Sequence, residues 1–482
     1  MTGSFADTAV GHYINGHWGT AQGRNVIDVI SPSDGRKVGA VVAGTDEDVN
    51  DAVEAASAAF PAWARTLPEE RIRLVERLIT EIERDRDALA AVLTEEMGSP
   101  LAFARAAQVG VAVADLRELV AAARTHHAER EISNSLVISE PVGVVAAITP
   151  WNFPLHQISL KVGAALLAGC TVVLKPSEVA PLNAAMLAGM VETAGFPAGV
   201  FNVVFGDGKG VGDPLVTHPK VDMVTFTGSR NVGERISIRA AASIKRVTLE
   251  LGGKSAAVIL DDAPVADSVS AVLRSAFANT GQTCAALTRV LVPSSMQELW
   301  VKQALEETHK WTPGRPEEES TVLGPLASIQ QLERVRLHIE QAIQDGAEVV
   351  TGGVGGVTGL EDGAFVHPTI FTNVTPDMRL FHEEVFGPVL AVTPYETVDE
   401  AIALANDSIY GLSGGVFSAD ESRALEVARQ LRTGTVGING AGLDVGAPFG
   451  GYKQSGNGRE CGTLGFEEFL ETKSVMGARK PS

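Results

Sequence analysis

The sequence has few cysteines and no long apolar run. Only Cys170, Cys284 and Cys461 occur in 482 residues, an odd number without the dense, even spacing of a disulfide-stapled secreted domain. This scarcity predicts a reducing, cytoplasmic location. The first lysine or arginine is Arg24, so the N-terminus lacks the pattern of a signal peptide. Apolar runs such as residues 142–148 are far shorter than the ~20 residues that cross a bilayer as a helix, which argues against a membrane partner.

Basic residues are outnumbered by acidic ones. Lys and Arg total 39 against 59 for Asp and Glu, which gives a formal net charge of −20 at pH 7. Such an acidic chain is unsuited to a nucleic acid or an anionic membrane surface as partner. The sequence also lacks a Cys-x-x-Cys pair and a His-Glu-x-x-His motif, so we expect no metal site. With 45% hydrophobic residues, the chain is large enough for two or three folded domains.

Two kinds of pattern follow one another along the chain. Residues 46–130 are rich in alanine and carry apolar residues on one helical face, which predicts packed helices. After Glu140, short apolar runs alternate with helix-length segments, as is typical of parallel strands joined by right-handed crossovers. The expected strands form two sets, residues 142–149, 171–174, 201–205 and 223–226, and residues 256–260, 290–292, 348–350, 369–371, 389–393 and 435–438.

These two sets predict two α/β domains. Gly252 and Gly253 lie between them, and the conformational freedom of glycine suits a junction there. Residues 132–139 alternate in polarity apart from both sets, and we expect them to form a hairpin arm that pairs with the C-terminal run 469–476. The glycine-rich residues 352–363 predict a surface loop.

One cysteine and one glutamate stand in segments suited to chemistry. Cys284 follows Asn279-Thr-Gly-Gln-Thr, a small polar segment that can expose a thiol and backbone N–H groups. Glu250 ends an apolar run, and burial of a carboxylate there would raise its pKa and suit a general base. Taken alone, a cysteine is by default a small buried residue, and we expect this of Cys170 and Cys461; without further context it holds for Cys284 too. Glu250 could equally be a surface residue of a strand.

Two further segments have features of nucleotide-binding loops. Thr227-Gly-Ser-Arg-Asn-Val-Gly follows an expected strand and opens an expected helix, where backbone N–H groups and the helix dipole can hold phosphate. Its glycine spacing differs from the GxGxxG fingerprint, so the motif is weak. Lys175-Pro-Ser-Glu also ends an expected strand, and its lysine and glutamate could contact ribose hydroxyls. The alternative for this second segment is a solvated loop.

Eight motifs occur in one order along the chain: Pro150-Trp-Asn-Phe-Pro, Lys175-Pro-Ser-Glu, Gly195-Phe-Pro-Ala-Gly-Val-Phe-Asn, Phe226-Thr-Gly-Ser, Glu250-Leu-Gly-Gly-Lys, Gly281-Gln-Thr-Cys, Glu383-Glu-Val-Phe-Gly-Pro and Pro448-Phe-Gly-Gly-Tyr-Lys-Gln-Ser-Gly. In these motifs the sequence resembles the aldehyde dehydrogenase superfamily, in its NAD(P)-dependent, hydrolytic branch. The resemblance extends from Ile14-Asn-Gly-His-Trp to Phe466-Glu-Glu-Phe and so covers almost the whole chain.

The resemblance implies that the protein oxidises an aldehyde to a carboxylic acid with NAD. The Cys284 thiolate would add to the carbonyl and form a thiohemiacetal, from which hydride can leave. The Asn152 amide and the Cys284 backbone N–H would hold the oxyanion. Glu250 would activate the water that hydrolyses the thioester.

The resemblance also implies a cofactor site. Lys175 and Glu178 match residues that bind the adenosine ribose, and Glu384 matches the residue that binds the nicotinamide ribose, with Phe386 beside it. A carboxylate at Glu178 would repel a 2′-phosphate, so NAD is expected and NADP is the less favoured cofactor. Small residues would line the rest of the site, Gly208 and Gly212 on the adenine side and Gly228, Ser229 and Gly233 near the pyrophosphate.

The implied fold class is α/β, with a Rossmann-type cofactor domain, an α/β catalytic domain and a small β oligomerisation arm. We expect the NAD-binding domain in residues 1–121 and 141–251 and the catalytic domain in residues 252–465. The arm would comprise residues 122–140 and 466–482. Family members form dimers or tetramers, so a homodimer or homotetramer is expected.

The same residues bear on three alternatives to this function. A CoA-acylating aldehyde dehydrogenase would pass the acyl group to a thiol, but such relatives typically lack a base like Glu250. A nucleotide-independent thiol hydrolase would leave Lys175, Glu178 and Glu384 without a role. A non-catalytic binding protein would leave Cys284 without one.

The substrate is expected to be a small-molecule aldehyde without a carboxylate. Relatives line the substrate tunnel with positions that correspond here to residues 155–160, Phe277, Thr283 and residues 440–447. None of these is a lysine or arginine, and a buried carboxylate usually needs a cation or several donors. His156 and Gln157 nevertheless argue against a purely apolar lining. Neutral, moderately hydrophobic aldehydes are therefore expected.

Overall fold

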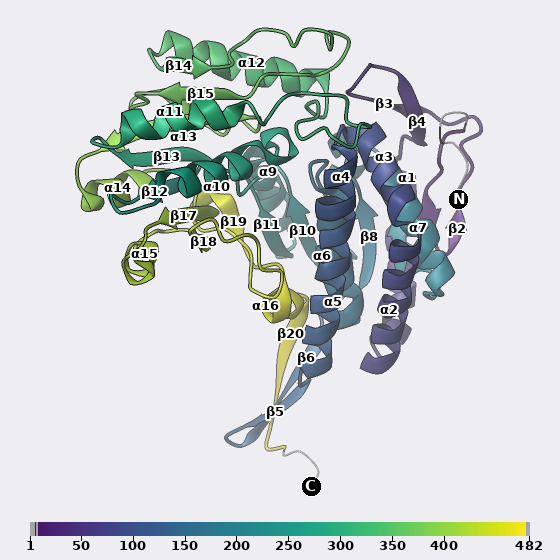
Figure 1. Cartoon of the computed structure of the whole chain (residues 1–482). Coiled ribbons are helices and arrows are strands. Elements are labelled where there is room, and N and C mark those ends of the chain that lie inside the picture. Colours follow the sequence, from purple (N-terminus) through teal and green to yellow (C-terminus); the bar gives the residue numbers. More distant parts are fainter. Residues whose placement is uncertain (1–4, 6–7, 479–482) are drawn as a thin grey trace.

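The computed structural model describes residue 5 and residues 8–478, and its strands form two large and two small sheets. Figure 1 shows the two large sheets side by side, each covered by helices, with a narrow arm extending from the body. Residues 1–4, 6–7 and 479–482, which belong to the expected cofactor domain and arm, lie outside the described residues.

The first large sheet has eight strands, β1 Tyr13–Ile14, β2 His17–Trp18, β7 Val144–Ile148, β8 Thr171–Lys175, β9 Phe201–Val203, β10 Met223–Thr227, β11 Arg246–Glu250 and β19 Gly456–Asn457. Their order is β19-β11-β10-β7-β8-β9-β1-β2. The five strands from β11 to β9 in this order pair in parallel, as the alternating apolar runs predict. β7, β8 and β10 are buried at every position, because helices cover both faces of the sheet.

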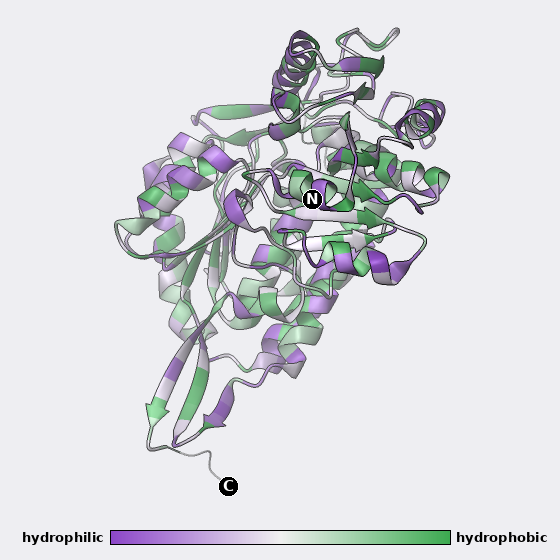
Figure 2. Ribbon diagram, turned by 90° about the vertical axis from the view of Figure 1, so that its left-hand side faces the viewer, coloured by the Kyte–Doolittle hydropathy of each residue, from purple (hydrophilic) through white to green (hydrophobic). Residues whose placement is uncertain are grey.

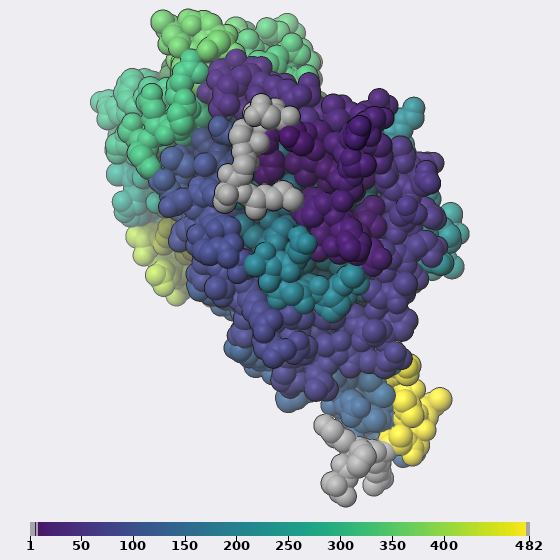
Figure 3. Space-filling view, turned by 90° about the vertical axis from the view of Figure 1, so that its right-hand side faces the viewer, coloured from purple at the N-terminus to yellow at the C-terminus, as the bar shows by residue number. Residues whose placement is uncertain are grey.

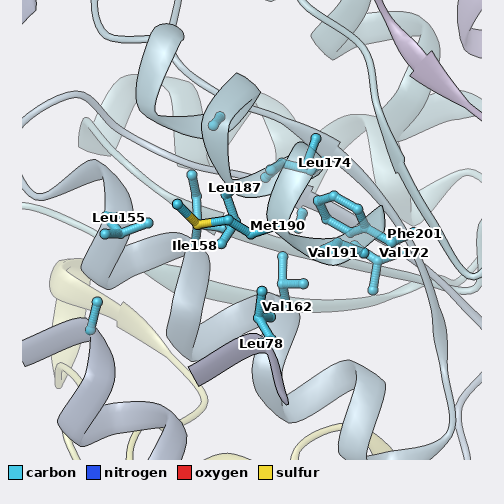
Figure 4. Packing of buried hydrophobic residues seen from close by; sticks show 14 of the residues in the cluster. Leu78, Leu155, Ile158, Val162, Val172, Leu174, Leu187, Met190, Val191 and Phe201 are labelled. Carbon is cyan, nitrogen blue, oxygen red and sulfur yellow. The ribbon is translucent and has the colours of Figure 1, made fainter. Parts of the chain in front are cut away.

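The helices of this half of the chain are α1 Asp46–Trp63, α2 Pro68–Arg84, α3 Arg86–Met97, α4 Leu101–Phe103, α5 Gly110–Thr125, α6 Pro154–Ala168, α7 Leu182–Ala194, α8 Asp213–Thr217 and α9 Arg230–Ala241, with π-helical turns η1 Ala104–Val109 and η2 Gly208–Gly212. Apolar residues of α2, α3, α5, α6 and α7 pack on one face of the sheet, and those of α1, α8 and α9 pack on the other. In Figure 4, Ile158 and Val162 of α6 lie near Leu187 of α7 and Val172 of β8. All fifteen residues of α6 are buried, so it is the central helix of this half.

The second large sheet has seven strands, β12 Ser255–Ile259, β13 Leu287–Pro293, β14 Glu348–Thr351, β15 Thr369–Thr372, β16 Val389–Tyr395, β17 Ser413–Phe417 and β18 Thr435–Ile438. Their order is β14-β15-β16-β13-β12-β17-β18, and only the β14–β15 pair is antiparallel. Sequence patterning misses β17, because Gly414 and Gly415 lower strand propensity. Gly415 is needed for packing, since a Cβ atom there would lie 2.9 Å from Leu287 Cδ1.

Helices also cover both faces of this second sheet, namely α10 Val265–Phe277, α11 Gln297–Thr308, α12 Ile329–Gln344, α13 Arg379–His382, α14 Val398–Asn406 and α15 Glu421–Ala428, with the 3₁₀ turn η3 Ala278–Gly281 after α10. Apolar residues of α10 and α11 pack on one face, and those of α12 to α15 on the other. Gly252 and Gly253 connect β11 of the first sheet to β12 of the second, as expected. The expected loop at residues 352–363 contains no helix or strand.

Two small sheets and two short C-terminal elements complete the described chain. β3 Val26–Ile30 and β4 Lys37–Val42 form an antiparallel pair. β5 Glu129–Ile132, β6 Ser135–Pro141 and β20 Leu470–Met476 form an antiparallel sheet in the order β20-β6-β5, which confirms the expected pairing of this hairpin with the C-terminal run. Figure 2 shows the three-stranded sheet as an arm projecting from the body, and in the space-filling view of Figure 3 blue and yellow residues extend from the body at its lower end. η4 Lys453–Ser455 and α16 Gly462–Glu467 flank β19 and lead into β20.

The C-terminal residues return to the first sheet. β19 pairs with β11, so that Gly456 lies opposite Glu250 and Asn457 opposite Leu249. The expected division of the chain assigned residues 456–457 to the catalytic domain, whereas their hydrogen bonds lie in the sheet of the expected cofactor domain. The two halves are therefore joined at Gly252 and again at β19.

Candidate active site

The candidate residues of the first sheet lie at the carboxyl ends of its parallel strands. Lys175 is the last residue of β8 and Glu250 the last of β11, while Asn152 follows β7 and Gly228 follows β10. The Gly228 N–H donates to the Glu250 carbonyl oxygen at 3.0 Å. Parallel strands place their carboxyl ends at one edge of a sheet, which is where α/β folds bind ligands. The fold thus gathers residues that are up to a hundred positions apart in sequence.

The turn before Cys284 has an unusual backbone. Asn279, Thr280 and Gly281 have φ angles of 53°, 57° and 72°, a conformation that is costly for Thr280 because it is β-branched. The Thr280 hydroxyl is held by a backbone carbonyl at 3.0 Å, and the Asn279 side-chain amide donates to the Asn152 carbonyl at 2.9 Å. These bonds hold the turn, and therefore Cys284, against the segment that carries Asn152.

Gly281→Ala is expected to destabilise the protein through this turn. A Cβ atom there would lie 2.2 Å from the Gly387 carbonyl carbon and 2.5 Å from the Pro388 nitrogen. Because these are backbone atoms, the turn itself must shift, and such overpacking costs about 1–3 kcal/mol beyond the strain of a positive φ. Gly35→Ala is the matched control, since Gly35 has the same φ of 72° with no atom within 4 Å of an added Cβ. Thermal denaturation should give the lower midpoint for Gly281→Ala, and equal midpoints would contradict the overlap.

Asn152 is buried and hydrogen-bonded on both sides. Its backbone carbonyl oxygen accepts hydrogen bonds from Gln108 Nε2 and Asn279 Nδ2, both at 2.9 Å. Its side-chain Nδ2 donates to the backbone carbonyl oxygen of Gln282, also at 2.9 Å. An amide NH₂ group has two N–H donors. One N–H therefore anchors Asn152 to the Cys284 segment, and the other has no partner among the described residues. This second donor is suited to an oxyanion that forms beside Cys284.

Glu250 is a buried carboxylate without a hydrogen-bond partner among the described residues. The residue is 5% exposed, and neither Oε1 nor Oε2 is bonded. Burial, together with the nearby carboxylate of Glu460, raises the pKa of Glu250 well above its usual value. The absence of a side chain at Gly450 leaves room for the Glu250 carboxylate, since a Cβ atom there would lie 2.7 Å from Glu250 Oε1. A carboxylate with a raised pKa is suited to accept a proton near neutral pH.

Cys284 lies in a turn between η3 and β13, beside the glycine junction. A Cβ atom at Gly253 would lie 2.6 Å from the Cys284 carbonyl oxygen. Burial and the carboxylates of Glu250, Glu384 and Glu460 raise the pKa of the Cys284 thiol to about 12. The thiol therefore keeps its proton at neutral pH, and its reaction as a thiolate requires a base or a nearby cation.

Glu384 and Phe386 enter the site from the loop before β16. Glu384 Oε1 accepts from the Gly253 N–H at 3.0 Å, and Gly252 lies so close that a Cβ there would be 2.0 Å from Oε2. Burial raises the pKa of Glu384 to about 7. Phe386 has a φ of 57°, and its ring lies edge-on to Trp151 with 5.4 Å between centroids. Both residues are thereby held at the junction of the two large sheets.

Lys175 and Glu178 form an ion pair at the end of β8. Lys175 Nζ lies 3.0 Å from Glu178 Oε2 and donates to the Pro176 carbonyl, also at 3.0 Å. The lysine is buried, whereas the Glu178 side chain is 41% exposed. The carboxylate is thus oriented by a buried cation and remains accessible to a ligand.

The small residues of the expected cofactor site differ in what surrounds them. Added Cβ atoms at Gly228 and Gly233 would lie 2.4 Å from the Phe226 ring and 2.6 Å from Leu251, so a side chain at either position would have to displace its neighbour. Ser229 is the N-cap of α9, and its side chain makes no capping hydrogen bond. Gly208 and Gly212 lie in η2, and no atom lies within 4 Å of a Cβ added at either position. Packing therefore does not explain the glycines of η2.

Sequence reasoning missed two buried lysines near the site. Lys161 of α6 forms an ion pair with Glu460, which lies 299 positions away. A lysine in an otherwise apolar helix is a readable signal, but its partner is not predictable at that separation. Lys254 is buried and its Nζ has no hydrogen-bond partner in the described part of the chain. Burial and the neighbouring Arg289 lower the pKa of Lys254 to about 7.

Comparison with known proteins identifies the family. The model of the aldehyde dehydrogenase family matches residues 18–475, nearly the whole chain. The chain belongs to the aldehyde dehydrogenase family. The predicted resemblance is therefore confirmed.

Relatives of this aldehyde dehydrogenase match it over almost their full length. It is 48% identical over 466 residues to 3-succinoylsemialdehyde-pyridine dehydrogenase of Pseudomonas sp., covering 96% of this chain and 98% of that one. Its fold matches that of an aldehyde dehydrogenase C mutant from Pseudomonas syringae in complex with NAD+ and octanal, with a TM-score of 0.98. The two sequences are 42% identical, and the match covers 100% of this chain and 99% of the other. For a Mycobacterium tuberculosis aldehyde dehydrogenase complexed with NAD+, the TM-score is 0.95, with 40% identity and 98% of each chain covered. These likenesses confirm the predicted fold class.

Two further features of this aldehyde dehydrogenase concern residue 5 and residues 8–478 alone. Within them, none of the helices combines the length and apolar character needed to cross a membrane. In the same residues, no group of three or more His, Cys, Asp or Glu side chains is arranged to hold a metal ion.

Proposed function

We propose that this aldehyde dehydrogenase oxidises an aldehyde to a carboxylic acid with NAD. The proposal is supported most by the meeting of Cys284, Asn152 and Glu250 at the junction of the two large sheets. A thiol, a free amide N–H beside it and a carboxylate of raised pKa are the groups that oxidation through a thioester requires.

The reaction begins at Cys284. Glu250 takes the thiol proton, and the thiolate adds to the carbonyl carbon to form a thiohemiacetal. The free N–H of Asn152 donates to the oxygen that becomes negative in this step. Loss of hydride from the same carbon leaves a thioester on Cys284. Glu250 next releases the thiol proton to solvent and then accepts a proton from water, whose oxygen attacks the thioester carbon. The C–S bond breaks, which releases the acid and regenerates the thiolate.

The residues present are suited to NAD. The accessible Glu178 carboxylate can accept from ribose hydroxyls, and the uncapped N-terminus of α9 at Ser229 offers backbone N–H groups to the pyrophosphate. Close to Cys284, Glu384 can accept from the second ribose, with Phe386 packed beside it. NAD, when bound, accepts the hydride, and its positively charged ring favours the Cys284 thiolate. Gly208, Gly212, Gly228 and Gly233 complete this proposed site by leaving backbone free of side chains.

NAD should be used at least about tenfold more efficiently than NADP, because a like charge beside the 2′-phosphate costs several kcal/mol. Lys175 could offset this repulsion, but its charge is already paired with Glu178 at 3.0 Å. Glu178→Ser should raise kcat/KM for NADP and lower it for NAD. The measurement is steady-state kinetics with both cofactors. Comparable values in the unmodified enzyme would contradict the preference, and a variant that gains nothing with NADP would show that another residue discriminates.

The reaction products distinguish the proposed hydrolytic branch of the family from the acylating branch. With octanal and NAD, we expect absorbance from reduced nicotinamide together with octanoic acid, and no stimulation by coenzyme A. Acyl-coenzyme A as the main product would favour the acylating alternative, which the buried Glu250 argues against. Hydrolysis of an ester without any nicotinamide turnover would favour a thiol hydrolase.

Neutral aldehydes are the substrates that we propose. Relatives named for 3-succinoylsemialdehyde-pyridine and crystallised with octanal support an aromatic or long aliphatic aldehyde. The segments 155–160 and 440–447 offer no lysine or arginine to a carboxylate, and Lys161, which follows the first, is paired with Glu460. A kcat/KM for succinic semialdehyde above those for butanal and hexanal would overturn this part of the proposal.

We also propose a cytoplasmic homo-oligomer. For its domains we propose the division expected from the sequence, apart from residues 456–457, which pair in the first sheet. Three free cysteines agree with a reducing compartment. The arm of β5, β6 and β20 projects from the body, and α9 with its following turn exposes Val232, Ile238 and Ile244, surfaces that a second copy can cover. A dimer or tetramer would be seen by light scattering, and a monomer at micromolar concentration would refute the assembly.

A further inference from the structure

Gln108 is a buried side-chain amide to which the proposed reaction assigns no step. The residue is 0% exposed, and its Nε2 donates to the backbone carbonyl oxygen of Asn152, 44 positions later, at 2.9 Å. The same nitrogen lies 3.9 Å from the Met97 sulfur, which is a weak acceptor. Its Oε1 is buried and has no hydrogen-bond partner within the described residues. An apolar side chain would avoid the cost of that unpaired oxygen. The bond to Asn152 is therefore the interaction that distinguishes Gln108 from an ordinary core residue.

The π-helical turn η1 determines where the Gln108 side chain leaves the helix. Gly110 N–H donates to the Arg105 carbonyl, five residues earlier, and Arg86 Nη2 of α3 donates to the same carbonyl at 2.9 Å. Successive residues of an α-helix lie about 100° apart around its axis, so the extra residue of a π turn changes the side to which its residues point. Here the turn packs against α6 and brings Gln108 to the Asn152 carbonyl, while α5 keeps its apolar residues in the core. Such turns occur frequently at functional sites.

The Asn152 carbonyl is held from both halves of the chain. Gln108 of η1 donates from the first half, and Asn279 Nδ2, in the turn before Cys284, donates from the second half, also at 2.9 Å. Among the described residues, Asn152 makes no other hydrogen bond through its backbone. The side chain is held separately, by the bond from Nδ2 to the Gln282 carbonyl. These three bonds together fix the direction of the N–H that remains free.

Gln108 is the single one of these three partners that belongs to the first half. Asn279 and Gln282 both lie in the segment that leads to Cys284. Without Gln108, Asn152 would be tied by its hydrogen bonds to that segment alone, and its carbonyl could turn away from η1. Hydrogen bonds weaken steeply as they bend, and a donor stabilises a developing oxyanion only when it is already aligned. A small rotation of Asn152 would therefore reduce the value of its free N–H.

We propose that Gln108 is a positioning residue for the oxyanion donor. By holding the Asn152 carbonyl from η1, it directs the free Nδ2–H of Asn152 toward the oxygen of the aldehyde that reacts with Cys284. Gln108 acts through Asn152 and is given no contact of its own with the aldehyde or NAD. This inference rests on the proposed function.

The test is a double-mutant cycle on Gln108 and Asn152, measured as kcat with octanal and NAD. Gln108→Met fills a similar space without a donor. It should lower kcat about tenfold, since a misplacement of about 1 Å in an active site can cost up to about 10²-fold. The KM for NAD should change less than about twofold, because the lost interaction is made in the transition state.

The second arm of the cycle removes the donor itself. Asn152→Ala should lower kcat on the order of 10²–10³-fold, the usual cost of losing one oxyanion donor. When Gln108→Met is added to Asn152→Ala, kcat should fall by less than about twofold more, because Gln108 then has no donor to position. A merely structural role would give the same fold-loss with and without Asn152.

Asn202→Leu is the matched control. Asn202 of β9 is likewise 0% exposed, and its Nδ2 donates to the backbone carbonyls of Val172 and Gly199 at 3.3 Å and 2.8 Å. Its removal should lower the midpoint of thermal denaturation but leave kcat within about twofold, since these bonds lie away from Asn152.

The outcomes separate this inference from the proposed function. An unchanged kcat in Gln108→Met, or an equal fold-loss in both backgrounds, overturns the inference and leaves the function intact. Full turnover by Asn152→Ala would refute the role of Asn152 and this inference with it. No oxidation of octanal by the unmodified enzyme would refute the proposed function itself. Should Gln108→Met fail to fold, Gln108→Asn takes its place in the cycle, because the shorter side chain draws the amide back from the Asn152 carbonyl.

Discussion

Cys284→Ala is expected to abolish aldehyde oxidation while NAD binding stays nearly unchanged. The thiol supplies the nucleophile, and we expect neither of the other cysteines to replace it, because Cys170 and Cys461 are almost completely buried. Removal of a nucleophile typically lowers kcat on the order of 10⁴-fold or more. Steady-state formation of reduced nicotinamide measures the loss, and calorimetric titration with NAD measures binding.

The controls for this variant are Cys170→Ala and Cys461→Ala, which should remain active. Cys170 is the cleaner of the two, because its thiol donates to the backbone carbonyl of Phe469, at 3.4 Å, and lies in the core of the first half. Measurable steady-state turnover by purified Cys284→Ala would refute the role of this thiol. Loss of NAD binding together with activity would instead show that the variant has damaged the fold.

Glu250→Gln is expected to slow turnover by roughly 10²–10⁴-fold, the usual contribution of a general base. The amide keeps the shape of the buried side chain but no longer accepts a proton from water. Thioester hydrolysis should be affected most, so an acyl-enzyme should accumulate on Cys284. Intact-mass analysis after mixing with octanal and NAD should show the added acyl group, with about one equivalent of reduced nicotinamide per active site.

Glu317→Gln is the control for this second variant, because Glu317 is an exposed carboxylate to which the proposed reaction assigns no role. It should turn over octanal as the unmodified enzyme does. Normal turnover by Glu250→Gln would show that another group activates the water. Slow turnover without an acyl-enzyme would place the defect before the thioester, at deprotonation of Cys284.

The sequence alone predicts the secondary-structure elements whose pattern lies in residues that are neighbours in the chain. The apolar runs predict β7, β8 and β10 within one or two residues, because strands buried on both faces are continuously apolar. Polar residues next to such strands, Lys175 and Glu250 among them, could be assigned to one edge of the sheet by the rules of parallel pairing. β17 escaped prediction because its two glycines weaken the local pattern.

Contacts between distant segments could not be predicted in the same way. The ion pair of Lys161 and Glu460 and the pair of Asp115 and His156 depend on how helices pack, which no local pattern records. The free N–H of Asn152 likewise follows from a bond to Gln282, 130 positions away. The positive φ angles of Asn279 and Thr280 run against local preference and are maintained by tertiary hydrogen bonds.

The return of β19 to the first sheet has a consequence for how the protein is made. While the chain is synthesised, the first sheet emerges with the edge of β11 unpaired, and Glu250 lacks its neighbours Gly450 and Glu460 until residues 450–460 leave the ribosome. N-terminal units commonly fold first during synthesis, but this one cannot be completed alone. An open strand edge readily pairs with other chains. The C-terminal residues therefore determine when, during synthesis, the nascent chain ceases to be prone to aggregation.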